Sequence, residues 1–116
     1  MGITGIDHLY AETVDWDSTT AFWHGLGFEF ASRWGDEGHR AGRLECGAAA
    51  VVIAEIPVGR RPEFTVFFHL DDGDDFKVDA TVEVVQPLED THWGTRWIRV
   101  ADPEGRVHAL ESPKEH

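Results

Sequence analysis

Histidine and carboxylate side chains recur at alternate positions in the β-like segments of this chain, an arrangement that could build a site on one face of a sheet. In residues 3–13, His8, Tyr10 and Glu12 fall on the same face, because successive strand residues point to opposite sides. Imidazole and carboxylate groups are common ligands of divalent metals. They also hydrogen-bond polar small molecules, so both kinds of site stay open.

Aromatic side chains accompany these polar groups in both halves of the chain. Aromatic rings beside a few carboxylates suit planar, cationic or aromatic small molecules. For Trp34, Trp93 and Trp97, a place in the core or in a dimer interface is an equal alternative, and for Trp16 and Trp23 such a place is the expectation. The predicted ligand-binding residues are His8, Tyr10, Glu12, Trp34, Thr65, Phe67, His69, Trp93, Trp97 and Glu111.

The elements that must position these residues follow the same order in each half. The first half reads as a strand, a helix capped by Asp15 or Asp17, and three further strands. The second half restarts with a strongly β-forming run and ends in a hairpin. The expected elements are strands at 3–13, 28–34, 39–46, 49–56 and 63–70, a helix ending near Leu26, a strand beginning near Thr81, and the hairpin at 92–111.

The second half departs from the first where its helix should be. Residues 73–80 are short, acidic and led by glycine, and helices this short are marginal. We therefore expect a truncated helix or a turn there. The chain of 116 residues is predicted to be one α+β domain over 1–116, with halves at about 1–56 and 63–116 and a Pro- and Gly-containing linker at 57–62.

Two motifs resemble those of one known superfamily. Residues 93–96 read Trp-Gly-Thr-Arg and are followed by Asp-Pro-Glu-Gly at 102–105, while Phe22-Trp23 precedes Leu26-Gly27-Phe28. Both are similar to motifs of the vicinal-oxygen-chelate proteins, which include glyoxalases, extradiol dioxygenases, and fosfomycin- and bleomycin-resistance proteins. The resemblance implies a curved mixed sheet built from two βαβββ-like halves.

The resemblance also implies where metal ligands would stand, and this sequence matches poorly. His8 fits the first-strand position, but the equivalent later positions hold Ala54, Thr65 and Ala109. His69 and Glu111 lie further along the same faces, and a shift of two strand residues moves a ligand by about 6–7 Å. The expectation is therefore no metal cofactor. The alternative is a divalent metal held by His8, His69 and Glu111 in a lyase, isomerase or dioxygenase.

Within the superfamily the chain most resembles bleomycin-resistance proteins. These are homodimers that sequester a cationic glycopeptide in clefts at the dimer interface and do no chemistry. The resemblance implies a non-enzymatic homodimer that holds a small molecule in an acidic, aromatic interface cleft.

Composition narrows the possible partners and the cellular compartment. The formal charge of −12 argues against nucleic acid, and it either attracts a cationic ligand or reflects solubility or high-salt adaptation. We expect no membrane partner, because no apolar run has membrane-spanning length. A single cysteine is consistent with a cytoplasmic protein.

Overall fold

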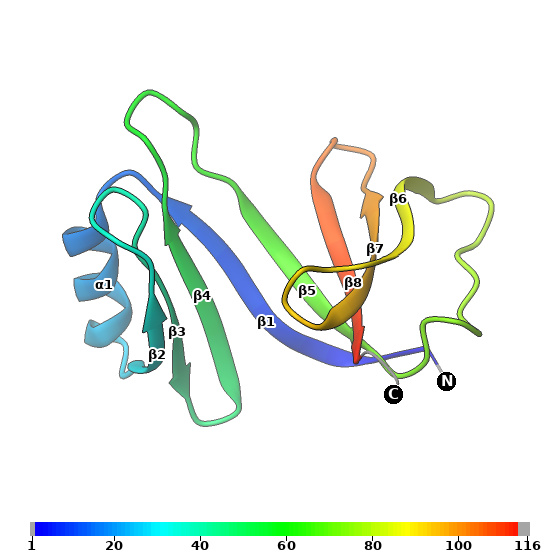
Figure 1. Ribbon diagram of the computed structural model, residues 1–116, viewed down its shortest axis with the longest axis horizontal. Helices are drawn as coiled ribbons and strands as arrows, with labels where there is room; N and C mark the ends of the chain where they lie inside the picture. The colour runs from blue at the N-terminus through cyan, green and yellow to red at the C-terminus, as the bar shows by residue number, and fades with distance from the viewer. Residues whose placement is uncertain (1, 114–116) are drawn as a thin grey trace. The chain divides into compact units, whose positions relative to one another are not determined.

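The computed structural model describes residues 2–113, and within them the chain forms eight strands and one helix. The chain divides into two units (Figure 1). The N-terminal unit is His8–Phe64, and the C-terminal unit joins the residues up to Asp7 to those from Thr65 onward. Strand β1, Ile3–Thr13, contributes its first residues to the C-terminal unit and the rest to the N-terminal unit.

The N-terminal unit is a four-stranded mixed sheet in the order β2-β3-β4-β1. Strands β2 and β3 pair antiparallel, as do β3 and β4, whereas β4 and β1 run parallel. The strand bounds are Glu29–Trp34 for β2, Ala41–Cys46 for β3 and Ala49–Glu55 for β4.

Helix α1, Trp16–Gly25, covers the apolar face of this sheet (Figure 1). Asp15 begins it as predicted, because its carboxylate accepts the otherwise unpaired amide of Ser18. Trp16 packs with Leu44, Val51 and other buried residues, and Trp23 packs against the same cluster. Both tryptophans therefore pack into the core, one of the two places expected for them. Since α1 has ten residues, none of the helical structure in residues 2–113 could cross a membrane.

The C-terminal unit repeats this pattern of pairing. Its strands follow the order β1-β5-β8-β7-β6. Strands β5 and β8 run parallel, whereas β8 pairs antiparallel with β7, and β7 with β6. The bounds are Phe64–Leu70 for β5, Glu83–Asp90 for β6, Thr95–Ala101 for β7 and Val107–Pro113 for β8. In both units the first and fourth strands of the half lie side by side, which confirms the α+β fold with two related halves.

The second helix is absent from the described residues, as expected. Residues 71–82 form turns and irregular backbone instead (Figure 1). Phe76 and Val78 from this loop pack against the apolar cluster of Leu70, Ile98 and Leu110. The loop therefore replaces a helix as the cover of an apolar sheet face.

Hydrogen bonds and one ion pair hold this loop in place. Asp72 accepts the amides of Asp74 and Asp75, at 3.0 Å and 3.4 Å. Arg96 of β7 donates to the carboxylate of Asp74 at 2.7 Å. Gly73 lies close to β6: a Cβ there would stand 3.0 Å from Leu88 Cδ1, and the Leu88 side chain would have to shift.

The β7–β8 turn carries one of the two superfamily motifs, and its role here is structural. The Asp102 carboxylate accepts the backbone amides of Glu104 and Arg106, the Arg106 guanidinium, and His108 Nε2. These hydrogen bonds hold the pKa of Asp102 well below its usual range, and the bond from His108 contributes most. Gly105 closes the turn with a φ of 84°, a region that favours glycine.

Candidate functional site

The strands of the C-terminal unit carry different chemistry on their two faces. Phe68 and Leu70 of β5 point into the apolar cluster under the 71–82 loop. Phe67 and His69 alternate with them and therefore point to the opposite face. The predicted site residues on the strands of this unit lie on that opposite face.

Strand register brings several predicted residues together there. His69 pairs with Glu111, and Glu111 pairs with Trp97, so these three side chains form one row across β5, β8 and β7. Phe67 lies in the adjacent row, with its ring centroid 6.0 Å from that of Trp97. Trp93, from the turn before β7, meets Trp97 edge to face at 5.1 Å.

We call this surface the aromatic face and define it by six residues. Five were predicted from the sequence as site residues, and the sixth, Arg99, was not. The aromatic face consists of Phe67, His69, Trp93, Trp97, Arg99 and Glu111.

Carboxylates fix the two indole rings of the aromatic face. Trp93 Nε1 donates to Glu111 Oε2 at 2.6 Å, and the same oxygen accepts the Thr95 hydroxyl at 2.8 Å. Trp97 Nε1 donates to Glu89 Oε1 at 3.0 Å. Charged acceptors make these hydrogen bonds strong. Both rings are therefore oriented before any ligand arrives, which reduces the entropy lost on binding.

Arg99 is the residue of the aromatic face that sequence reasoning missed. Its guanidinium carbon lies 5.0 Å from the centroid of the Trp97 ring. Its Nε is buried and has no hydrogen-bond partner within residues 2–113. The available signal was its position two residues after Trp97 in a strand, which places both side chains on one face.

Two further polar groups adjoin the aromatic face. The Thr4 hydroxyl lies 2.7 Å from Nδ1 of His69. The carboxylates of Asp7 and Glu111 approach within 4.8 Å. The C-terminal part of the site therefore contains both signs of charge around the aromatic rings.

The remaining predicted residues, apart from Thr65, belong to the N-terminal unit. Glu12 accepts the amide of Glu63 at 3.1 Å, so its carboxylate fixes the chain before β5. Burial, reinforced by Glu12 and Glu63, raises the pKa of Tyr10. Trp34 ends β2 with 51% of its surface exposed. His8 is the first residue of the N-terminal unit, whereas His69 and Glu111 belong to the C-terminal unit. Thr65, also in the C-terminal unit, is half-buried on β5.

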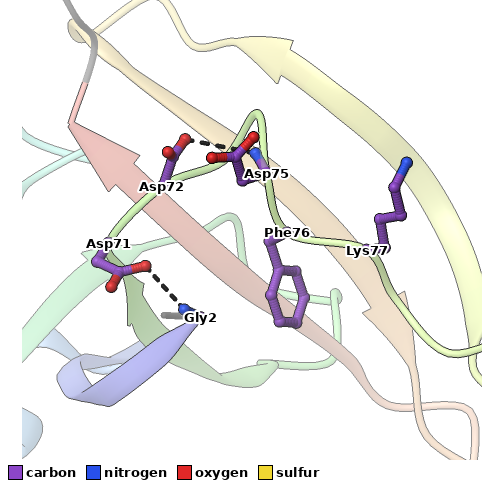
Figure 2. Close-up of a pocket in the computed structure, with 6 residues that line it drawn as sticks. All are labelled: Gly2, Asp71, Asp72, Asp75, Phe76 and Lys77. Carbon is purple, nitrogen blue, oxygen red and sulfur yellow. Dashed lines mark hydrogen bonds between the residues drawn. The ribbon is translucent and has the colours of Figure 1, made fainter.

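The sequence also gave no indication of a hollow of about 340 Å³ in the C-terminal unit. Figure 2 shows its lining, in which Asp71 accepts the amide of Gly2 at 2.8 Å. The hydrogen bond from Gly2 is the main cause that lowers the pKa of Asp71. A hydrogen bond with Asp72 is the main cause that raises the pKa of Asp75. The carboxylates thus hold the strand end and the 71–82 loop. The lining residues are Gly2, Asp71, Asp72, Asp75, Phe76 and Lys77.

Comparison with protein families identifies the class to which the chain belongs. Residues 5–107 match the model of the glyoxalase/bleomycin resistance protein/dioxygenase superfamily. The chain is a member of this superfamily, as its two motifs and its two related halves indicated. No curated protein matches the chain.

Solved structures share the fold at low sequence identity. A superfamily member from Vibrio splendidus 12B01 is 19% identical, with 90% of this chain and 96% of that one covered and a TM-score of 0.63. A mutant of 4-hydroxymandelate synthase from Streptomyces coelicolor has 19% identity and a TM-score of 0.75 over 95% of this chain. A Mn(II)-bound glyoxalase from Novosphingobium aromaticivorans has 17% identity and a TM-score of 0.65 over 96% of this chain.

The last two proteins are much longer than this chain. The match spans only 38% of the synthase and 39% of the glyoxalase. These similarities establish the fold, and the chemistry of the site must be argued from this chain's own residues.

Proposed function

We propose that the chain binds a small planar molecule on the aromatic face and does not transform it, as the resemblance to bleomycin-resistance proteins implies. The observation that carries the proposal is the pair of tryptophans held by carboxylates on the face opposite the core. Tryptophans needed only for stability would be expected among the buried apolar residues. Trp93 instead keeps 47% of its surface exposed.

The geometry favours stacking over catalysis. Trp97 and Phe67 lie 6.0 Å apart and tilted by 33°, and Trp93 stands almost perpendicular to Trp97, at 87°. The Trp93 and Trp97 rings offer flat apolar area to a planar ligand, whereas Phe67, only 8% exposed, supports the Trp97 ring. Glu111, the carboxylate at the centre, already accepts two hydrogen bonds through Oε2, so its first role is to hold Trp93 and Thr95.

The homodimer is the second part of the proposal. Phe22 of helix α1 and Leu26, the residue that caps its C-terminus, are each 58% exposed and stand one turn apart. Exposed apolar neighbours of this size favour contact with another chain, and a two-fold partner is the commonest arrangement. Sedimentation at micromolar concentration should give twice the mass of one chain, and a single-chain mass would contradict this part.

Tryptophan fluorescence tests the binding proposal. We expect naphthylmethanol, a planar and uncharged probe, to quench the emission saturably, and Trp97→Ala to weaken its binding by about 10-fold. Trp34→Ala is the matched control in the N-terminal unit and should leave the affinity unchanged. Equal affinity of the native and Trp97→Ala chains, or no saturable binding, would overturn the proposal.

The approach of Asp7 to Glu111 favours one alternative, a metal-dependent lyase, isomerase or dioxygenase. Two carboxylates within 4.8 Å could share a divalent cation. The donor set fits a metal poorly, however, because Ala109 has no ligand atom and Thr65 offers only a hydroxyl. Stoichiometric metal in the purified protein that is lost in His8→Ala would support the enzyme. For the binder, His8→Ala should be nearly neutral.

A further inference from the structure

The aromatic face contains one guanidinium, that of Arg99, which no carboxylate of the described residues binds. Within residues 2–113 its guanidinium forms no ion pair and no hydrogen bond, and Nε is shielded from solvent without an acceptor. A buried donor left unpaired is costly. The chain has 22 acidic residues against 10 lysines and arginines, so an unpaired arginine is unexpected here.

The other arginines that stack on aromatic rings differ from Arg99. Arg40 lies over Trp16, but two hydrogen bonds tie its guanidinium to Glu55. Arg33 lies over Phe30 at 4.7 Å on an exposed strand end, where water can solvate it. Arg99 alone of these three combines an aromatic contact with a buried, unpaired nitrogen.

The residues beside Arg99 in the sheet carry no charge. Arg99 pairs with Gln86 of β6 on one side and with Ala109 of β8 on the other. The nearby carboxylates of Glu89 and Glu111 are bound to the indole groups of Trp97 and Trp93. Arg99 thus offers free hydrogen-bond donors to an incoming anion, while Glu89 and Glu111 keep their negative charges and are oriented by the indole groups.

We infer that the ligand of the aromatic face is a planar aromatic molecule that carries a carboxylate or a comparable anionic group, with Arg99 as the anion-binding residue. The ring stacks on Trp97, and the anion accepts hydrogen bonds from the guanidinium, a fork that matches carboxylate geometry. This inference rests on the proposed function. It reverses the charge of ligand that the acidic composition suggested.

Three probes of one shape but different charge test the inference by calorimetry at 0.15 M salt, where screening over about 8 Å suppresses the long-range repulsion from the chain. The probes are naphthoate, naphthylmethanol and naphthylmethylammonium. We expect naphthoate to bind most tightly, by about 10-fold over naphthylmethanol, because charge-assisted hydrogen bonds are stronger than neutral ones. The ammonium probe should bind most weakly.

Variants then assign the effect to one residue. Arg99→Gln should remove the preference for naphthoate while naphthylmethanol still binds, and Arg99→Lys should keep part of it. Arg33→Gln is the matched control, since it removes an exposed arginine that lies over an aromatic ring in the N-terminal unit. It should leave all three affinities unchanged.

The possible failures are distinguishable. If naphthylmethanol or the ammonium probe binds the native chain as tightly as naphthoate, the inference is wrong but the proposed function stands. If no probe binds, both are wrong. An unchanged preference for naphthoate in a folded Arg99→Gln chain would also overturn the role of Arg99.

Discussion

Two tryptophans of the N-terminal unit and two of the C-terminal unit are used in opposite ways. In the N-terminal unit, Trp16 and Trp23 pack into the core between α1 and the sheet. In the C-terminal unit, Trp93 and Trp97 lie on the face away from the core, and carboxylates hold their indole groups. The apolar cluster of that unit is closed instead by Phe76 and Val78 from the 71–82 loop.

This difference separates residues that maintain the fold from residues that are free to bind. A loop that supplies its own apolar side chains can cover a sheet face without a helix. The aromatic residues of the last hairpin are then not needed for the core. The superfamily fold can thus be kept while one half specialises, which agrees with the view that function lies in the site and not in the fold.

The largest expected effect is the loss of a core tryptophan. Trp16 is 8% exposed, stacks on Phe30 at 6.1 Å and contacts the main N-terminal cluster. Trp16→Ala should lower the free energy of unfolding by about 3–5 kcal/mol, measured by urea denaturation. Trp93→Ala is the comparison in the other unit and should cost about 1 kcal/mol or less. Similar losses for the two variants would contradict the division of roles.

The sequence predicted most of the fold because its signals were local. The Asp15 cap, the alternation in β1 and β5, and the turn around Asp102 each depend on a few neighbouring residues. The loss of the second helix was also visible as a short, acidic segment. The family motifs supplied the order of the halves.

The site was predictable only in part, because it depends on pairing between distant strands. Alternation placed Phe67 with His69, but only the register shows that Glu111 lies between His69 and Trp97. The sequence suggested that Glu111 supplies charge to a ligand or a metal, and it could not show that Glu111 also accepts hydrogen bonds from Trp93 and Thr95. Arg99 was missed because nothing local marks an arginine that lacks a partner.

Smaller losses of stability are expected from the aspartates that begin helix α1 and the 71–82 loop. Asp15 caps α1 through the amide of Ser18, and Asp72 caps the loop through the amides of Asp74 and Asp75. Asp15→Ala and Asp72→Ala should each reduce the free energy of unfolding by about 1 kcal/mol. Asp17→Ala, in the first turn of α1, is the control and should change it less. No loss for Asp72→Ala would show that polar capping does not hold the loop.

The smallest expected effect is a pH dependence in the N-terminal unit. Hydrogen bonds from Arg40, the main cause, lower the pKa of Glu55 from 4.5 to about 2. A carboxyl with a lower pKa in the folded chain contributes stability above its unfolded pKa and loses it as the pH falls. Between pH 4.5 and about 2, native stability should therefore decline more than that of Glu55→Gln, as followed by thermal melts. Parallel pH profiles of the two chains would rule out this contribution.

The indole groups themselves provide the most direct test that the two units divide structure from binding. The chain has five tryptophans, and each indole N–H gives its own signal in a nitrogen–proton correlation spectrum, which single Trp→Phe variants can assign. On titration with naphthoate, the account predicts progressive shifts of the Trp93 and Trp97 signals, while those of Trp16, Trp23 and Trp34 stay in place. Shifts centred on Trp34, or no shift at Trp97 at saturation, would contradict it.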